Sequence, residues 1–507
     1  MAEPVAATTP AVRWAKVVDH TRCIGCHACS TACKSENQVP LGVHRTYVKS
    51  VDVGVFPQAR RAFQVTRCNQ CEHPPCAVAC PTSAMHQRKD GIVDFDKSIC
   101  IGCKACIAAC PYDAIFINPE DHSAEKCNFC AHRLDIGLEP ACVVVCPTEA
   151  ILVGDLNDAT SKVARIVSRE PVTVRRPEKD TRPKLFYKGA HQATLDPLAA
   201  RRPDGGLFMW SEQGPHLASG HPGRAGGAAA ALLSYDIPHH VPWDWRVSLY
   251  TWTKGIAAGA TLVAFLLVTL GVIGSASPLW RWWAPLISVF FLAATGAVLI
   301  ADLSHPWRFY LIFTRPQWRS WLVRGGVILA GYGMVLAVHL AGAAAGSAAL
   351  LSWTGALGVP LAVLTAVYTA YLLAQAKARD LWQSPLLPPQ LLVQALLAGA
   401  AALRLVAPAS EPSAVETLSW IIAATSALHL LLVVGEVTLT HATAHARLAT
   451  SEMTRGTYRT FFRAGMAGMA AGMLAPWLGA PAAALALAGL LAYEHAYIQA
   501  GQAVPLA

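Results

Sequence analysis

The sequence contains no cysteine after Cys146, although the residues up to that point contain all 16. Charged residues make up only 14%, and no dinucleotide-binding glycine fingerprint, P-loop or nucleophile elbow is evident. These absences argue against a nucleotide-dependent enzyme or a serine hydrolase. The first 20 residues have no apolar core and no twin arginine, so we expect neither an export signal nor the disulfides of a secreted protein.

The cysteines fall into four groups of four with short, regular spacing. The groups are Cys23, Cys26, Cys29 and Cys33; Cys68, Cys71, Cys76 and Cys80; Cys100, Cys103, Cys106 and Cys110; and Cys127, Cys130, Cys142 and Cys146. A C-x2-C-x2-C loop directs three thiolates at one 4Fe–4S cluster, and the fourth cysteine of such a run ligates the other cluster of a pair. Sixteen thiols therefore predict four 4Fe–4S clusters and an electron-conducting protein.

The spacing argues against two other uses of these cysteines. Thiols two residues apart in a tight loop do not easily meet the geometry of a disulfide. Structural zinc needs two C-x2-C units per ion, and the fourth group, with eleven residues between Cys130 and Cys142, comes nearest to a zinc ribbon. A non-redox membrane scaffold held together by zinc stays as an alternative.

An internal repeat indicates the fold of the cysteine-rich part. Cys-Ile-Gly-Cys occurs at 23–26 and again at 100–103, and the first and third groups have identical spacing. Two ferredoxin-like units related by an approximate twofold axis would produce this repeat. We therefore predict an α+β double-ferredoxin-like iron–sulfur domain over residues 1–150. Groups two and three are expected to share one cluster pair, and groups one and four the other.

Residues 151–245 have too few apolar side chains to form a core of their own. We predict that they form an extended linker or strap. Its basic stretch, 175–184, is expected to lie on protein, and no nucleic-acid partner is expected.

Long apolar runs begin at about Arg246. The candidate spans are 247–273, 284–301, 321–343, 349–374, 388–406, 414–440, 462–479 and 481–499. Because a membrane-spanning helix needs about 20 apolar residues, residues 246–507 predict an all-α bundle of eight transmembrane helices. The last two runs are short and would form a tight hairpin, because only Gly479, Ala480 and Pro481 separate them.

The charges in the loops predict the orientation. With eight spans, the even-numbered loops share a side with the cysteine-rich domain, and they carry ten basic residues: Arg308, Arg315, Arg319, Arg324, Lys377, Arg379, Arg447, Arg455, Arg459 and Arg463. The opposite side carries Arg281 and Arg404. The positive-inside rule then places the cysteine-rich domain in the cytoplasm, at the inner (cytoplasmic) membrane.

Residues 15–150 resemble the four-cluster electron-transfer subunit of the molybdopterin oxidoreductases, the class of dimethyl sulfoxide and polysulfide reductases. The segment from Cys68 to Met85 is typical of that family. The resemblance implies four ligand sets. Set A is Cys23, Cys26, Cys29 and Cys146; set B is Cys33, Cys127, Cys130 and Cys142; set C is Cys68, Cys71, Cys76 and Cys110; set D is Cys80, Cys100, Cys103 and Cys106.

The apolar part resembles the eight-helix NrfD/DmsC-like anchors of the same complexes. The likeness lies in 302–309 with 320–325, and in 435–447. The resemblance implies a fused electron-transfer and anchor subunit. A separate catalytic subunit with a molybdenum or tungsten bis-pterin cofactor would exchange electrons with it, and the membrane quinone pool would take or supply them.

Polar residues in the apolar part gather near the helix ends on the cysteine-rich side. They are Lys254, Asp302, His305, Arg324, Tyr371, Glu436, His441, Glu494 and His495. Some of them would be explained by side chains that reach the membrane interface. The alternative is a quinone site, which needs hydrogen-bond donors and a proton source. For this site we select Lys254, Asp302, His305 and Tyr371, with Glu436 as an acid on a proton path. His339 and His429 are the mid-helix histidines, and no haem is expected.

The sequence thus favours an electron-transfer and membrane-anchor subunit that joins a catalytic partner to quinone. The alternative is a self-contained ferredoxin:quinone oxidoreductase or an ion-translocating redox module.

Overall fold

The computed structural model describes residues 12–201, 231–407 and 411–506, and the chain divides into two compact units. The first, here called the cysteine-rich unit, comprises Met1–His240 and Pro505–Ala507. The second, the helical unit, comprises Val241–Val504. The boundary thus falls between His240 and Val241, a few residues before the predicted position at 246.

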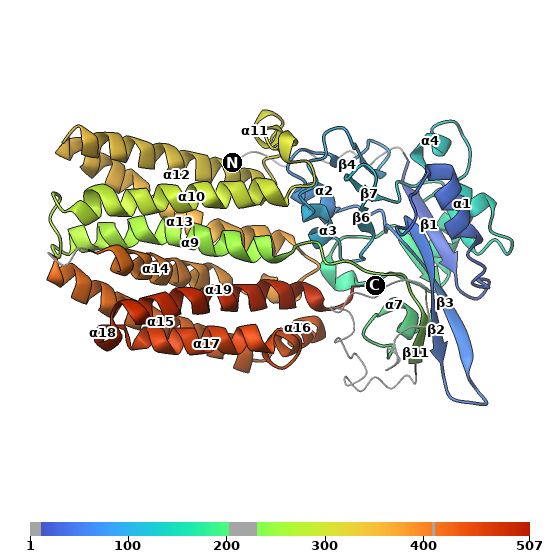
Figure 1. Cartoon of the computed structure of the whole chain (residues 1–507). Helices are drawn as coiled ribbons and strands as arrows, with labels where there is room; N and C mark the ends of the chain where they lie inside the picture. The colour runs from blue at the N-terminus through green and yellow to red at the C-terminus, as the bar shows by residue number, and fades with distance from the viewer. Residues whose placement is uncertain (1–11, 202–230, 408–410, 507) are drawn as a thin grey trace. The chain divides into compact units, whose positions relative to one another are not determined.

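Short strands and helices make up the cysteine-rich unit (Figure 1). Its strands are β1 (Trp14–Asp19), β2 (Thr46–Val53), β3 (Arg60–Arg67), β4 (Met85–Gln87), β5 (Val93–Phe95), β6 (Ile115–Ile117), β7 (Ala124–Lys126), β8 (Ile151–Asp155), β9 (Val172–Thr173), β10 (Leu185–Lys188) and β11 (Ala231–Tyr235). Its helices are α1 (Ala28–Asn37), α2 (Pro75–Ala79), α3 (Ala105–Ala109), α4 (Ala131–Leu134), α5 (Ala141–Val144), α6 (Lys162–Arg169), η1 (Pro177–Lys179) and α7 (Gln192–Leu195).

The strands form two larger sheets and two hairpins. The four-stranded sheet has the order β8-β1-β10-β9, in which β1 pairs in parallel with β10 and antiparallel with β8. The three-stranded sheet has the order β11-β2-β3 and is antiparallel throughout. The hairpins are β4-β5 and β6-β7. This is the α+β fold that the cysteine repeat predicts.

The segment 151–201 differs from the extended linker predicted for it. Strands β8, β9 and β10 come from this segment and complete the sheet around β1. Val163, Leu185 and Tyr187 are buried there. A few apolar residues suffice because they pack on a core that earlier residues supply, so the segment needs no core of its own. The remaining part of the predicted linker includes 202–230, which lies outside the described residues.

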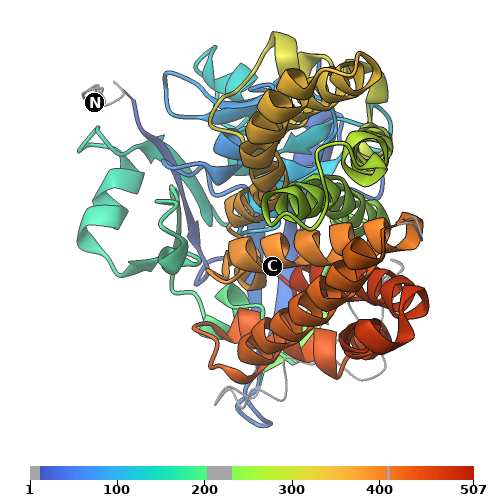
Figure 2. The ribbon, with the colours of Figure 1, turned by 90° about the vertical axis from the view of Figure 1, so that its left-hand side faces the viewer.

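The helical unit consists mainly of long helices that run side by side (Figures 1 and 2). Its elements are α9 (Trp245–Thr269), η3 (Leu279–Trp283), α10 (Ala284–Asp302), η4 (Pro306–Arg308), α11 (Leu311–Thr314), α12 (Trp321–Ala344), α13 (Ala348–Gln375), η5 (Asp380–Gln383), α14 (Leu387–Val406), α15 (Pro412–Thr438), α16 (Ala444–Thr454), α17 (Arg459–Met473), α18 (Ala475–Leu478) and α19 (Ala480–Ala503).

Each of the eight predicted apolar runs contains helix, but the described helices give six candidate membrane spans. These six are α9, η3 continued by α10, α12, α13, α14 and α15. Helix α17 has 15 residues and is followed by the short α18. Helix α19 has 24 residues but is less apolar than the six. The structure therefore supports a membrane-type bundle and bears out six of the eight predicted spans.

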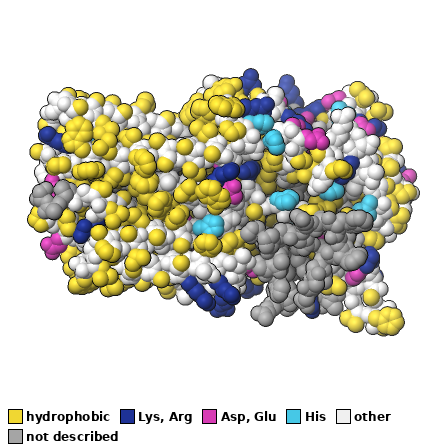
Figure 3. Space-filling model, viewed as in Figure 1, with side chains coloured by type: hydrophobic (Ala, Val, Ile, Leu, Met, Phe, Trp, Pro, Cys, Tyr) yellow, Lys and Arg dark blue, Asp and Glu magenta, His cyan; other side chains and the backbone are white. Residues whose placement is uncertain are grey.

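Helix α9 lies at the centre of the bundle and packs against α10, α13, α14 and α19. Its contact with α14 is very close, because a Cβ on Gly259 would lie 1.7 Å from the Ala395 carbonyl oxygen, and Gly399 faces the Gly259 backbone. The outward faces of the other helices expose large apolar side chains such as Phe290, Met334, Trp353, Leu431 and Trp477. Hydrophobic side chains cover most of the visible face of the bundle (Figure 3), as a surface in contact with lipid requires.

Candidate functional sites

The two copies of the Cys-Ile-Gly-Cys loop follow the same backbone path. Gly25 and Gly102 both have φ of +68°, and the residues before the following helices, His27 and Lys104, have φ of +60° and +61°. Positive φ is uncommon for residues other than glycine. Its recurrence at equivalent positions shows that both loops present their three thiols by the same turns.

The thiols of set A and those of set B lie together as two groups. Burial raises the pKa of Cys23, and its set A neighbours Cys146 and Cys26 raise it further. Burial also raises the pKa of Cys33 to about 12, and the three other thiols of set B add to that rise. The structure thus brings Cys146 to the first group and Cys33 to the fourth. This exchange of the last cysteine is the arrangement of a two-cluster ferredoxin.

Sets C and D show the same exchange. Burial raises the pKa of Cys71, and Cys68 and Cys110 of set C raise it further. Burial raises the pKa of Cys106 too, and the other three thiols of set D are among its further causes. Cys110 therefore lies with the second group, while Cys80 lies with the third.

Thiols of neighbouring sets also approach one another. Three thiols have a pKa that is raised mainly by burial and further by a thiol of the neighbouring set. The pairs are Cys29 with Cys142, Cys68 with Cys127, and Cys106 with Cys76. These electrostatic neighbours place the sets in the order A, B, C, D.

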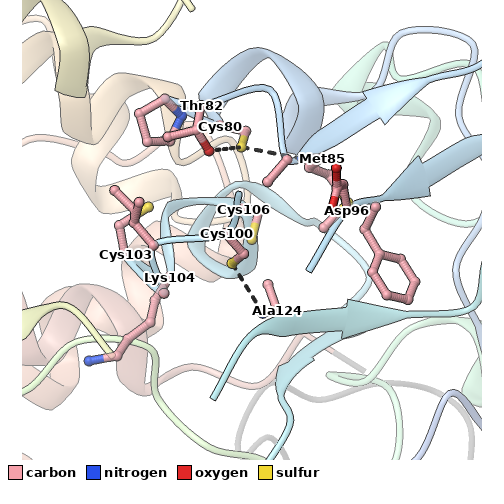
Figure 4. A pocket seen from close by; sticks show the side chains of 14 residues that line it. Cys80, Thr82, Met85, Asp96, Cys100, Cys103, Lys104, Cys106 and Ala124 are labelled. Carbon is pink, nitrogen blue, oxygen red and sulfur yellow. Dashed lines mark hydrogen bonds between the residues drawn. The ribbon is translucent and has the colours of Figure 1, made fainter. Parts of the chain in front are cut away.

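The surroundings of set D show that its thiols suit a cluster. All four cysteines line one cavity with an empty volume of about 380 Å³ (Figure 4). The backbone N–H groups of Met85 and Ala124 donate to Cys80 Sγ and Cys100 Sγ at 3.3 and 3.4 Å. Among the described residues, no three His, Cys, Asp or Glu side chains are placed to hold a single metal ion. The thiols of set D thus line one shared pocket, as the ligands of a single cluster would.

Set B gives a second test of whether the thiols suit a cluster, because two buried cationic side chains contact one of its sulfurs. Arg67 Nη1 donates to Cys142 Sγ at 3.0 Å, and Lys16 Nζ lies 3.7 Å from the same sulfur. Burial alone would raise the pKa of Cys142, but Arg67 and Lys16 outweigh it and lower the pKa to about 7. Arg67 Nε and Nη2 are buried and have no hydrogen-bond partner within the described chain. The sulfurs of an anionic cluster would supply the missing acceptors.

In the helical unit, Lys254 occupies a buried polar site between α9 and α13. Its Nζ donates to Thr369 Oγ1 at 2.7 Å and to the Ala366 carbonyl at 2.9 Å. It also lies 4.8 Å from the ring centroid of Tyr368. Glu494 is near enough to interact electrostatically with Lys254. A lysine amino group and a carboxyl group are thus enclosed within the apolar bundle.

Asp302 and His305 lie at the end of α10, and Tyr371 lies elsewhere. Asp302 is the last residue of α10, and both Asp302 and His305 are half-buried. Asp302 is close enough to Tyr250 to affect it electrostatically. Tyr371 is 42% exposed and stacks on Trp321 at 4.6 Å between ring centroids. The structure therefore places Tyr371 on the outside of α13, whereas Tyr368 faces Lys254.

Glu436 is buried on α15 and has neighbours different from those of Lys254. The Tyr497 hydroxyl donates to Glu436 Oε1 at 3.4 Å. Of the mid-helix histidines, His339 bonds Thr354 Oγ1 at 2.9 Å, and His429 packs edge-on against Tyr493 at 4.9 Å between centroids. Each of these groups is held by its own contacts.

Comparison with known proteins agrees with both units. A family described as "4Fe-4S dicluster domain" matches residues 59–156, and one described as "Polysulphide reductase, NrfD" matches 235–505. A tetrathionate reductase subunit of Salmonella typhimurium is 43% identical over 201 residues, which are 38% of this chain and 79% of that protein. A polysulfide reductase subunit of Wolinella succinogenes is 42% identical over 179 residues, or 35% and 94%. Arsenate respiratory reductase iron-sulfur subunit ArrB of a Shewanella species is 35% identical over 224 residues, or 35% and 96%.

The chain belongs to the NrfD family and to the family of these iron–sulfur subunits. It is an iron–sulfur electron-transfer protein fused to an NrfD-type membrane anchor. The cysteine-rich unit is therefore called the iron–sulfur unit below, and the helical unit is called the NrfD unit.

Sequence reasoning missed part of the polar site in the NrfD unit. Glu494 stood among the polar residues at helix ends but received no role, and Tyr368 and Thr369 were not singled out. The signal was weak because α13 is apolar around its whole circumference, so the pattern does not tell which tyrosine faces inward. The Thr251 hydroxyl, which donates to Glu494 Oε2 at 2.9 Å, was likewise invisible without the fold.

Proposed function

We propose that this protein is the electron-transfer and anchor subunit of an oxidoreductase complex, and that it connects a catalytic subunit to the membrane quinone pool. The observation that carries the proposal is the union, in one chain, of four thiol sets with an NrfD unit. The related iron–sulfur proteins are named after reductases, which supports a separate catalytic partner. We expect that partner to hold a molybdenum or tungsten bis-pterin cofactor.

Sets A, B, C and D would each hold one 4Fe–4S cluster. The grouping of the thiols by burial and mutual proximity supports these ligand sets. Clusters in these sites would accept and release single electrons. The role of the chain is to hold them in the order A, B, C, D and to bury most of their sulfurs.

Set A is the candidate docking point for the catalytic subunit. Cys26 is exposed, whereas every thiol of sets B and C is buried. Exposed apolar side chains lie close in sequence to set A cysteines: Ile24, between Cys23 and Cys26, is 59% exposed, and Val144, two residues before Cys146, is 63% exposed. Apolar exposed side chains beside a redox site suit a protein interface. Set D, at the other end of the order, would serve the membrane side.

The NrfD unit would cross the inner membrane several times, with the iron–sulfur unit in the cytoplasm. The excess of arginine and lysine in the even-numbered loops supports this orientation. The pair formed by α17–α18 and α19 would complete eight spans, since Gly479 at φ +64° turns the chain between them.

Reduction of a quinone requires a hydrogen-bond donor for its carbonyl oxygens and a source of protons. Asp302 and His305 at the end of α10 are candidates, together with Lys254. Glu436 would be an acid on the proton path. Tyr371, outside α13 beside Trp321, would line the approach of a lipid-borne quinone. The buried, hydrogen-bonded amino group of Lys254 supports a polar site inside the bundle.

Substitution of Asp302 by Asn tests the quinone site in the whole complex. We expect quinone-linked turnover to fall by about 100-fold or more, because a positioned proton donor contributes about that much. Turnover with an artificial dye should be unchanged, and so should the electron paramagnetic resonance (EPR) signals of the clusters. His305→Ala should show the same separation.

The matched control is Glu416→Gln, which also removes one carboxylate from the NrfD unit. Glu416 is exposed near the start of α15 and is assigned no role in the site. We expect normal quinone turnover in this variant. Normal quinone turnover in both Asp302→Asn and His305→Ala would contradict the assignment, while loss of dye-linked turnover would show damage elsewhere.

A further inference from the structure

Arg67 and Lys16 form a buried cationic site without a carboxylate partner among the described residues. Arg67 is 2% exposed and Lys16 is 1% exposed. Neither forms an ion pair with an acidic side chain in the described ranges. A buried charge without a counter-charge costs several kcal/mol. An anion at set B would remove this cost, and a cluster bound by four thiolates is such an anion.

The positions of both side chains are fixed by regular structure. Arg67 is the last residue of β3, and its backbone pairs with Thr46 on β2. Lys16 lies on the central strand β1 and packs 4.1 Å from the centroid of the Phe129 ring. Because a guanidinium remains charged at any physiological pH, Arg67 in particular keeps a permanent positive charge at Cys142.

Other set B sulfurs also receive side-chain donors. Asn37 Nδ2 donates to Cys33 Sγ at 3.6 Å and lies 3.7 Å from Cys130 Sγ. Three of the four set B sulfurs thus have a side-chain N–H group nearby. Hydrogen-bond donors and positive charge are therefore concentrated at set B, and both affect the reduction potential of a cluster.

The contacts at neighbouring sets are of a different kind. Lys126 lies near set C but donates to the carbonyl oxygens of Val93 and Cys127, and Lys184 donates to the Gly91 carbonyl at 2.7 Å. At set D, Cys80 and Cys100 accept backbone N–H groups. Within the described ranges, the hydrogen bonds from buried cations to a ligand sulfur given above are those of Arg67 and Lys16 to Cys142 of set B.

We propose that Arg67 and Lys16 raise the reduction potential of the cluster in set B, so that it is the first of the four to be reduced. The inference rests on the proposed assignment of clusters to thiol sets. One-electron reduction adds one negative charge to the cluster, and nearby buried cations stabilise the reduced state more than the oxidised one. Net charge and hydrogen bonds to sulfur are known determinants of cluster potential.

The position of set B gives this property a role. Set B is second in the order, directly behind the exposed set A and two steps from set D. Arg67 and Lys16 therefore place the favoured electron site just inside the docking face. An electron from a partner would be held there, with set A free to exchange again.

A redox titration monitored by EPR tests the proposal on the purified whole complex. Arg67→Gln should decrease at least tenfold the equilibrium constant for reduction of one cluster, which corresponds to about 59 mV for a one-electron couple. Lys16→Gln should shift the same signal less, because its nitrogen is farther from the sulfur. Arg67→Lys should retain most of the wild-type potential. The signal altered in Cys142→Ser identifies the cluster of set B.

The matched control is Arg61→Gln, the same substitution on the same strand. Arg61 is exposed and pairs with Asp52, with its Nε at 2.7 Å from Oδ1, so all four potentials should stay unchanged. Iron content equal to wild type shows that the clusters are present. If Arg67→Gln loses iron, the change in the set B reduction potential of Lys16→Gln tests the proposal instead.

Two results would overturn the inference. One is an unchanged potential for the set B signal in a cluster-replete variant, and the other is a wild-type titration in which another cluster is reduced first. Failure of the broader proposal would look different. It would appear as fewer than four cluster signals, or as loss of the match between Cys142→Ser and a single signal.

Discussion

The two copies of Cys-Ile-Gly-Cys have the same backbone turns but opposite surroundings. Ile24, in the first copy, is 59% exposed, whereas Ile101, in the second, is 2% exposed. Cys26 is exposed, and its counterpart Cys103 is half-buried. The repeat therefore encodes a ligand loop, while the rest of the chain decides whether that loop faces solvent or the protein interior.

The acidic residues that follow the two groups show the same contrast. Glu36 and Asp113 each lie three residues after the last cysteine of their group. Glu36 pairs with His132 and Arg133, both at 2.9 Å, and these partners lie partly in solvent. Asp113 pairs at 2.5 Å with His239, whose side chain is 10% exposed and which lies next to His240, the end of the unit's long segment. One half of the repeat thus offers a surface, and the other half is tied into the interior.

The largest effect on stability is expected from one of two matched variants, each of which introduces an aspartate into one copy of the loop. Ile101→Asp should destabilise the region around set D by about 5 kcal/mol, because an apolar side chain is lost and a carboxylate is buried without a partner. We expect loss of the cluster of set D, seen as reduced iron per chain and one missing EPR signal. Ile24→Asp should retain all the iron.

Ile101→Val is the control for this comparison, because it keeps an apolar side chain and should cost about 1 kcal/mol. Ile24→Asp should instead weaken association with the catalytic subunit, as measured by co-purification. Equal iron loss from Ile24→Asp and Ile101→Asp would show that the two loops do not differ in the proposed way.

The contrast marks how far the sequence could lead. Cysteine spacing is a local signal, and it predicted the ligand loops and the α+β fold. The length of the apolar runs is a second local signal, and it predicted the positions of the long helices. Exposure depends on packing between distant segments. Ile24 and Ile101 have the same sequence neighbours, so the sequence could not tell which of them is buried. Tyr368 and Tyr371 both lie in an apolar helix, so the sequence could not tell which of them faces inward.

The site in set B shows the same limit. Arg67 and Lys16 are 51 residues apart in sequence, and their common target Cys142 is farther still. No spacing rule connects a residue at the end of β3 with one on β1 and one on α5. The strands of the segment 151–201 were not predicted for a related reason. They form a sheet with β1, which is more than 100 residues earlier in the sequence.

The second prediction concerns pH and the largely buried pair of Asp113 and His239. Burial alone would lower the pKa of His239, but the carboxylates of Asp236 and Asp113 outweigh it and raise the pKa to about 9. A raised pKa means that the folded state favours the charged form. The resulting stabilisation, about 3 kcal/mol, is complete below pH 6.5 and is lost as pH rises through about 9.

Thermal midpoints of wild type and His239→Gln, measured from about pH 6 to about pH 10 at one scan rate, test this effect. We expect wild type to be more stable at the acidic end, with the difference shrinking towards the alkaline end. The subtraction removes other groups that titrate in both proteins. A difference that grows with pH would contradict the proposed charge state of His239.

The smallest effect is expected at the exposed counterpart of Asp113. Glu36→Gln should change stability by about 0.5 kcal/mol or less, because its partners are partly solvated and surface ion pairs contribute little. Asp113→Asn should cost more, since it leaves the largely buried His239 with one carboxylate, Asp236, at 3.2 Å. Thermal midpoints of both variants at neutral pH and at low and high salt give the comparison. Salt should reduce the small effect of Glu36→Gln and leave that of Asp113→Asn nearly unchanged, because buried pairs are screened less. A larger loss of stability for Glu36→Gln than for Asp113→Asn would mean that the first group, and not the third, is the one tied into the interior.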